Sequence, residues 1–182
     1  MLLKGIIQIR VKADPEKPLM AVKPINTEIA CASSHSRWMT SFQKPMRPPA
    51  FELLEHPADV KLRARGADLG ELFSNAAAGM MAYLFGPDIA NARPERTETI
   101  ELVAPDREAL LVDFLSELLY RAASEYCAYI DVHPRELGER RIVASAGVVS
   151  ARALDDIKAI THHELAIRRQ ADEWEATVVF DI

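Results

Sequence analysis

Apolar and polar residues alternate along much of the chain after residue 50, and this alternation predicts strands. In residues 174–182 every second side chain is apolar, and alternate residues of a strand share a face. This segment should therefore be a strand with one buried face. The turn at 168–173 should pair it antiparallel with the strand before it. Further strands are expected at 51–56, 59–65, 97–103, 126–132, 141–149 and 157–167.

Two segments have the helical period instead. Asp68 followed by Glu71 has the spacing of a capping box, and Gly86-Pro87 should end that helix near Phe85. A longer helix should begin at Pro105-Asp106 and continue to about residue 125, with 88–96 as a loop and 134–140 as a turn. The order of elements predicts an α+β class, a two-layer domain with two main helices packed on a largely antiparallel sheet. The expected buried stripe of the first helix comprises Leu69, Leu72, Phe73, Ala76, Ala77, Met80 and Leu84.

The composition fits a soluble globular domain. The chain has 182 residues, of which 49% are hydrophobic, and no apolar run approaches the roughly 18 residues of a membrane span. Its two cysteines show no paired spacing, so neither a disulfide framework nor a zinc motif is expected. A cytoplasmic protein with no membrane association follows from this pattern.

The first 50 residues differ from the rest. They carry eight basic and three acidic residues with recurrent prolines, whereas residues 51–182 have a net charge of −10. We expect residues 1–50 to be a disordered basic extension. Two alternatives are an over-extended reading frame, with Met46 as the natural start, and a basic organelle-targeting leader. The acidic remainder should not bind RNA by bulk attraction, because phosphate binding depends on basic charge.

Two aspartates are the main candidates for chemistry. Parity places Asp181 on the polar face of its strand, beside the carboxylate of Ile182, and places Asp59 on a polar face just after Pro57. Adjacent carboxylates form a hard-oxygen site that can hold Mg²⁺ or Ca²⁺ if a third acid joins them. The alternative is that Asp181 merely keeps the terminus solvated.

Three histidines and a lysine are weaker candidates. His56 could brace the turn at Pro57, and Lys158 could be a charge at a strand edge. His162 and His163 are neighbours in a predicted strand and point to opposite faces, so they cannot chelate one ion together. The sequence contains no Gly-rich phosphate loop and no Ser/His/Asp motif.

Four motifs, in order, resemble those of the archease family. The segment His56-Pro-Ala-Asp59 is similar to its opening His-Thr-Ala-Asp element, and 110–119 resembles its Leu-rich second helix. Residues 158–163 are similar to its Lys-Ala-x-Thr-Tyr-His motif, and the chain closes on Asp-Ile as the family does. The resemblance covers about residues 51–182. Pro57 replaces the usual threonine and His162 the usual tyrosine.

The resemblance implies a metal site and a partner. Asp59, Asp181 and Ile182 would bind a divalent cation, Ca²⁺ or Mg²⁺, with Lys158 as the motif lysine and His56 and His162 nearby on the partner side. Archeases are non-catalytic activators of the RtcB-type RNA ligase in tRNA splicing and RNA repair. GTP acts on that ligase, and RNA is reached only through it.

We therefore expect an acidic tip, defined as Asp59, Asp181 and Ile182, to enter the ligase active site and promote guanylylation and multiple turnover. One alternative is a general protein-interaction or chaperone-like module with an acidic binding surface. Another is a small metal-dependent hydrolase, which lacks an obvious general base to act with the two carboxylates.

Overall fold

A computed structural model of the chain describes residues 50–55 and 59–182. These residues belong to the second of two compact units, Pro45–Ile182, into which the chain divides. The predictions made for residues 1–49, and those for His56 and Pro57, lie outside the described residues.

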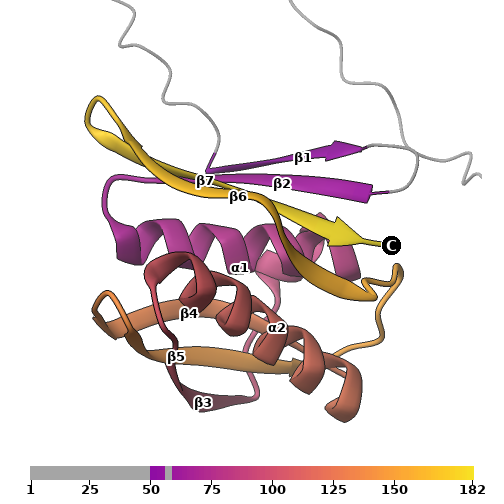
Figure 1. The fold of residues 1–182 in the computed structure, drawn as a ribbon. Helices are drawn as coiled ribbons and strands as arrows, with labels where there is room; N and C mark the ends of the chain where they lie inside the picture. The colour runs from indigo at the N-terminus through magenta and orange to yellow at the C-terminus, as the bar shows by residue number, and fades with distance from the viewer. Residues whose placement is uncertain (1–49, 56–58) are drawn as a thin grey trace, which may run out of the picture. The chain divides into compact units, whose positions relative to one another are not determined.

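The described residues form two antiparallel sheets and two long helices (Figure 1). One sheet has four strands in the order β1-β2-β7-β6, and the other has three in the order β3-β5-β4. In chain order the elements are β1 (Phe51–Glu55), β2 (Asp59–Gly66), α1 (Leu69–Phe85), the 3₁₀ helix η1 (Pro87–Asn91), β3 (Arg96–Val103), α2 (Arg107–Glu125), β4 (Cys127–Leu137), β5 (Arg141–Ser150), β6 (Ala159–Gln170) and β7 (Glu173–Asp181).

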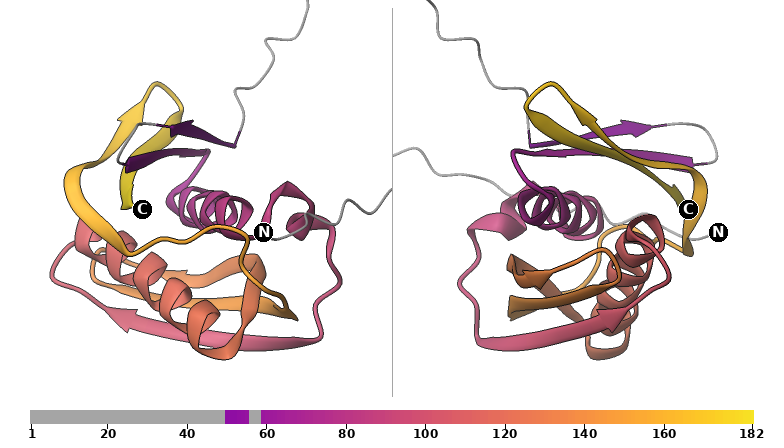
Figure 2. Two further views of the ribbon diagram at one scale, coloured as in Figure 1. Left: turned by 90° about the vertical axis from the view of Figure 1, so that its right-hand side faces the viewer. Right: turned by 60° about the vertical axis from the view of Figure 1, so that its left-hand side comes forward.

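The helices pack between the two sheets (Figure 2), which confirms the predicted α+β class. Helix α1 contacts β2 of the four-stranded sheet and β4 of the three-stranded sheet, and α2 packs against β6 and β4. The apolar surface of α1 accordingly extends beyond the one predicted stripe. Gly79 lies against Leu62 of β2, while the sulfur of Met81 accepts a hydrogen bond from the amide of Tyr129 on β4 at 3.5 Å. The strands thus divide into two sheets because α1 is apolar on two sides.

The predicted helix starts are confirmed by their caps. The side chain of Asp68 accepts a hydrogen bond from the amide of Glu71 at 2.8 Å, and a carboxylate oxygen of Glu71 accepts one from the amide of Ala67 at 2.7 Å. Asp106 caps α2 in the same way through the amide of Ala109. These bonds satisfy amides that a helix leaves without partners in its first turn.

Several predicted boundaries were wrong. The segment predicted as a loop at 88–96 contains most of η1, and the turn expected at 134–140 begins only after Leu137, because β4 continues through Pro134. The register of β4 against β5 shifts on both sides of that proline. Such shifts accommodate a residue that has no amide to donate. Tyr126, predicted to begin a strand, instead ends α2 in the left-handed region, at φ 52°.

Strand β6 also departs from the predicted alternation over 157–167. It begins at Ala159, and its register against β7 shifts between Thr161 and Ala166, where Glu164 has φ 55°. Ile160 faces the core opposite Phe180. The irregularity means that one parity does not hold along the whole strand, because a bulge moves later side chains to the other face.

Among the described residues, no helix combines the length and apolar character needed to cross a bilayer.

Tyr129 of β4 is fully buried, and its hydroxyl donates a hydrogen bond to Glu98 of β3 at 3.0 Å. Burial, followed by this bond, raises the pKa of Tyr129 well above its ordinary value. Glu98 also accepts from Arg96 at 2.8 Å. The neutral phenol therefore links β4 to β3, and Arg121 of α2 lies 3.5 Å from the same carboxylate oxygen of Glu98.

Loss of the Tyr129 proton should destabilise the fold at alkaline pH. Because the folded pKa is raised above the unfolded value of about 10, the contribution of the neutral phenol is complete below pH 10 and is lost as the pH rises above it. Urea unfolding of the wild type should show the free energy of unfolding falling above pH 10. Tyr129→Phe should reduce this slope, whereas Tyr120→Phe, at an exposed position, should keep it. An unchanged slope in Tyr129→Phe would contradict the assignment.

Candidate metal and partner-binding site

Strand β7 brings the two candidate aspartates together. It lies between β2 and β6, and its register pairs Asp181 with Asp59 on one side and with Ala159 on the other. Directly opposed residues in an antiparallel pair have their Cβ atoms roughly 5 Å apart on the same face. Asp59 is half-buried and Asp181 is exposed. The two carboxylates therefore stand side by side where β2 begins and β7 ends.

The alternation that located these aspartates agrees with the burial of both strands. Ala176, Val178 and Phe180 of β7 are fully buried, and β2 alternates between half-buried and buried residues along its length. Val179 departs from the pattern, since it lies on the predicted polar face but is only 3% exposed. It pairs with Lys61 and Thr161, so neighbours on both sides cover it.

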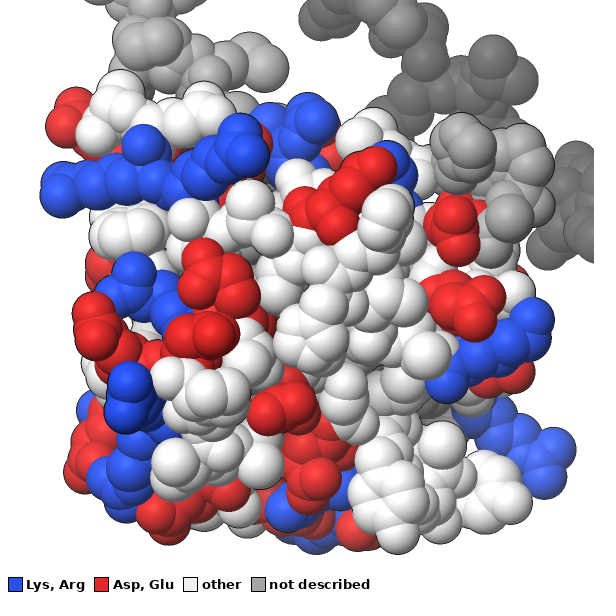
Figure 3. Space-filling model, in the orientation of Figure 1, with Lys and Arg blue, Asp and Glu red and all other residues white. Residues whose placement is uncertain are grey.

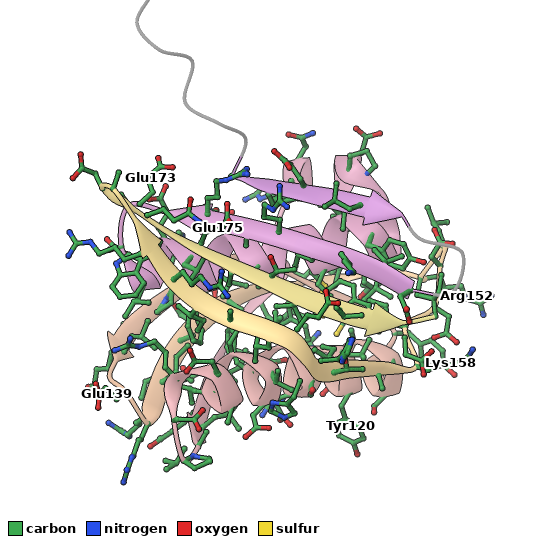
Figure 4. The ribbon with its side chains drawn as sticks, turned by 45° about the horizontal axis from the view of Figure 1, so that its top comes forward. Tyr120, Glu139, Arg152, Lys158, Glu173 and Glu175 are labelled. Atoms are coloured by element: carbon green, nitrogen blue, oxygen red, sulfur yellow. The ribbon has the colours of Figure 1, made fainter. Side chains whose placement is uncertain are left out.

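Lys158 holds the end of the chain in place. Its amide donates a hydrogen bond to the main-chain oxygen of Asp181 at 2.8 Å, and its Nζ donates one to the main-chain oxygen of Ile182 at 2.7 Å. Figure 4 shows Lys158 at the end of the sheet where β7 terminates, with Glu173 and Glu175 toward the opposite end. The structure thus places the motif lysine beside the terminal residue of the acidic tip.

The aspartate pair is not neutralised by the described residues. Neither Asp59 nor Asp181 forms an ion pair with them, although like charges directly opposed across strands destabilise a sheet. In the described ranges, no third His, Cys, Asp or Glu side chain completes a metal-binding group with the two aspartates. The main-chain oxygen of Ile182, which accepts a hydrogen bond from Lys158, is a further oxygen at this end of the sheet. Oxygens of this kind are the ligands that Mg²⁺ and Ca²⁺ prefer.

The rest of the same sheet face, from Lys61 to Arg65 along β2, is neutralised by ion pairs. Arg65 bonds Glu52 at 2.9 Å and Glu175 at 3.0 Å, and Lys61 bonds Glu164 at 2.6 Å. The hydrogen bond to Glu52 is the main cause that raises the pKa of Arg65 above its ordinary value. Charge is therefore balanced along β2 except at its first residue, Asp59.

The histidines do not join the aspartates in the part of the chain that the structure describes. His162 is exposed in the irregular stretch of β6, and it forms no metal-binding group with other described residues. The exposed His163 has its Nε2 3.6 Å from a carboxylate oxygen of Glu164. His56 lies outside the described residues, so its predicted role stays a prediction.

A cavity beside Lys158 was not predicted from the sequence. It has a volume of about 470 Å³ and is lined by the C-terminal half of α2, the end of α1, Ala153 and residues 155–160. Its walls include Ala122, Ala123, Ala153 and Ala159. Such small residues give no periodic signal of their own, and the segments that carry them meet only in the folded domain.

The fold and this site define a class of small α+β protein, with two helices between antiparallel sheets and an aspartate pair where two strands of one sheet meet. Residues 51–182 match the model of the archease protein family (MTH1598/TM1083). The chain belongs to the archease family.

Archaeal relatives agree with this membership. The archease of Methanosarcina acetivorans is 34% identical over 147 residues, which cover 76% of this chain and 99% of that protein. The archease of Methanosarcina barkeri is 37% identical over 141 residues, covering 72% and 95% of the two chains.

Solved structures agree with the fold. The solution structure of Methanobacterium thermoautotrophicum protein 1598 has a TM-score of 0.55 at 29% identity and covers 73% of this chain and 99% of that one. A Thermotoga maritima protein described as "an archease, possible chaperone" has a TM-score of 0.52 and covers 75% and 98%. At 22% identity, the Thermotoga structure supports the fold alone.

Replacing Lys158 should loosen the end of the chain. Lys158→Met removes the Nζ contact to Ile182 but keeps the backbone bond to Asp181. Release of the terminal isoleucine by a carboxypeptidase, followed by mass spectrometry, should therefore become severalfold faster. Lys61→Met, which breaks an ion pair further along the sheet, should release it at the wild-type rate. Equal rates in all three proteins would show that Lys158 does not restrain the terminus.

Proposed function

We propose that this protein is a non-catalytic activator of an RtcB-type RNA ligase. It promotes the guanylylation and multiple turnover of that ligase in tRNA splicing and RNA repair. Membership of the archease family supports this role. The observation that carries it is the direct pairing of Asp59 with Asp181 where β2 begins and β7 ends. A carboxylate pair that forms no ion pair with the described residues is suited to bind a cation or a cationic site in a partner.

Asp59, Asp181 and the main-chain oxygen of Ile182 would hold a divalent ion, Mg²⁺ or Ca²⁺. Their chemistry fits such an ion, since all three contribute hard oxygens and the aspartates lack another counter-charge among the described residues. A divalent ion neutralises charge on nucleotide phosphates when it is bound near them. The role of Lys158 in this proposal is to keep the terminal oxygen oriented toward the aspartates.

The charge of the domain supports docking to an RNA-binding partner. Residues 51–182 carry a net charge of −10, and an enzyme that binds RNA needs basic surfaces near its active site. Opposite potentials steer the approach of two proteins and fix their orientation. In this proposal RNA is bound by the ligase alone, GTP reacts with the ligase, and both proteins act in the cytoplasm.

The tip aspartates should bind a divalent ion directly. In calorimetric titration with Mn²⁺ or Ca²⁺, Asp59→Asn and Asp181→Asn should each weaken binding on the order of tenfold, because each removes one charged oxygen ligand. Asp113→Asn removes an exposed acid on α2 and should bind as the wild type does. If all four proteins bind alike, the tip is an acidic surface and not a metal site.

The ligase assay tests the role itself. Substoichiometric wild-type protein should stimulate multiple-turnover ligation by the cognate ligase with GTP and Mn²⁺, and should increase the guanylylated ligase followed in parallel. Asp59→Ala should lose most of this stimulation while remaining folded. Stimulation by both proteins would retain the activator role and reject the role of Asp59.

The same variants separate the activator from a chaperone-like module. A folded wild type that leaves ligation and guanylylation unchanged would reject the activator. Suppression of aggregation of an unfolded client by both the wild type and Asp181→Asn would then favour the chaperone-like module.

A further inference from the structure

An apolar groove runs along the C-terminal half of α2. The 470 Å³ cavity beside Lys158 and a second cavity of about 410 Å³ share Ala122, Ala123 and Ala153, so they are adjoining parts of one depression. Figure 3 shows a broad uncharged surface over this half of α2, at the centre and lower right of the view. We call this depression the α2 groove, lined by the residues of the two cavities.

Exposed apolar side chains gather at the α2 groove. The described residues include five large apolar side chains that are exposed, and two of them line the groove: Tyr120 at 69% and Tyr126 at 69%. A third, Leu154 at 75%, follows the lining residue Ala153 in the chain. Tyr120 projects outward from α2 in Figure 4. Contiguous exposed apolar surface of this kind is typical of a protein-binding site.

The wall of the α2 groove opposite α2 is fixed by backbone hydrogen bonds. The amide of Ala151 donates to the oxygen of Tyr126 at 3.0 Å, and the amide of Leu154 donates to the oxygen of Leu84 at 2.7 Å. These bonds attach the segment after β5 to the ends of both helices. The groove is therefore preformed, which lowers the entropic cost of binding.

The charges around the α2 groove define the chemistry of its occupant. Asp155 and Asp156 line it and form no ion pair with other described residues. Of the two basic residues in its lining, Lys158 already binds the oxygen of Ile182, which leaves Arg152. A segment with an apolar side chain for the groove and basic residues beside it would complement this surface, whereas RNA phosphates would meet two aspartates.

The α2 groove also adjoins the acidic tip. Lys158 lines the groove, and its Nζ contacts Ile182 at the tip. A partner that receives the tip must therefore cover the neighbouring end of the groove. We propose that the α2 groove binds a segment of the RNA ligase in which an apolar side chain is followed by Arg or Lys. This inference rests on the proposed function, and it assigns affinity to the groove and activation to the tip.

Filling the α2 groove should weaken docking without changing the activated state. Ala123 is an exposed helical residue that lines both cavities, so Ala123→Gln places a longer polar side chain in the groove at a small cost in helix propensity. The concentration that gives half-maximal stimulation should rise at least tenfold, while stimulation at saturation stays unchanged. The matched control is Ala78→Gln, at an exposed position on α1 that lines a different cavity. It should behave as the wild type does.

Removing the groove acids tests the charge of the occupant. The double variant Asp155→Asn/Asp156→Asn should raise the half-maximal concentration severalfold and reduce its dependence on salt. Asp88→Asn/Asp113→Asn removes two exposed acids elsewhere and should not. Asp59→Ala should show the reverse pattern, with lower stimulation at saturation and a nearly unchanged half-maximal concentration.

Direct binding to the ligase, measured by fluorescence anisotropy, separates the two proposals. Wild-type binding that Ala123→Gln weakens supports the groove even where ligation is not stimulated, a result that would reject only the activator role. Stimulation and binding by Ala123→Gln equal to the wild type would overturn the groove alone. Absence of wild-type binding would overturn both. A wild-type dimer in sedimentation that Ala123→Gln dissociates would place a second copy in the groove and overturn the ligase segment.

Discussion

The fold depends on a layer of helices that must be apolar toward two sheets. Gly79 gives α1 a close approach to Leu62 on one side, while Met81 contacts β4 on the other. Phe73 of α1 and Phe114 of α2 meet within the layer, with ring centroids 6.0 Å apart. Because each sheet has one face covered by this layer, the outer face of the four-stranded sheet is left to polar side chains. That face carries the ion pairs of Lys61 and Arg65, and Asp59 and Asp181 stand at its end.

Charge on that face is segregated along the strands. Arg65 lies between two glutamates and Lys61 is paired with Glu164, whereas the aspartate pair has no such partner among the described residues. On this face, the acidic pair without an ion-pair partner among the described residues therefore lies at one end of the strands. A partner with a basic cleft would meet this end first, with the α2 groove beside it. Orientation and affinity can thus come from adjacent but different surfaces.

Local patterns predicted much of the fold, because caps and alternation act over a few residues. Asp68 and Asp106 located both helix starts, and the parity of the last strand located its buried face. The division into two sheets was not predictable, since it depends on which side of α1 each strand covers. The path of β4 through Pro134 and the irregularity of β6 near Glu164 likewise depend on pairing with distant strands.

The candidate site shows the same limit. Parity placed Asp59 and Asp181 each on a polar face, but their direct opposition requires the register between β2 and β7. The contact of Lys158 with Ile182 requires the register that sets the start of β6 opposite the end of β7. The α2 groove had no sequence signal, because its alanines come from a helix, from the segment after β5 and from the start of β6. Interactions between segments distant in sequence thus account for what the sequence left undetermined.

The position of β7 has a consequence for the folding pathway. Strand β2 comes near the start of the domain, yet its partner β7 comes after every other element. The four-stranded sheet can close only when the last strand has been synthesised, and joining such distant segments carries a loop-closure cost that slows folding. Until then β1, β2 and α1 leave apolar surface uncovered on the nascent chain. Folding should accordingly be slow and late during synthesis, with a partly folded state that is prone to aggregation.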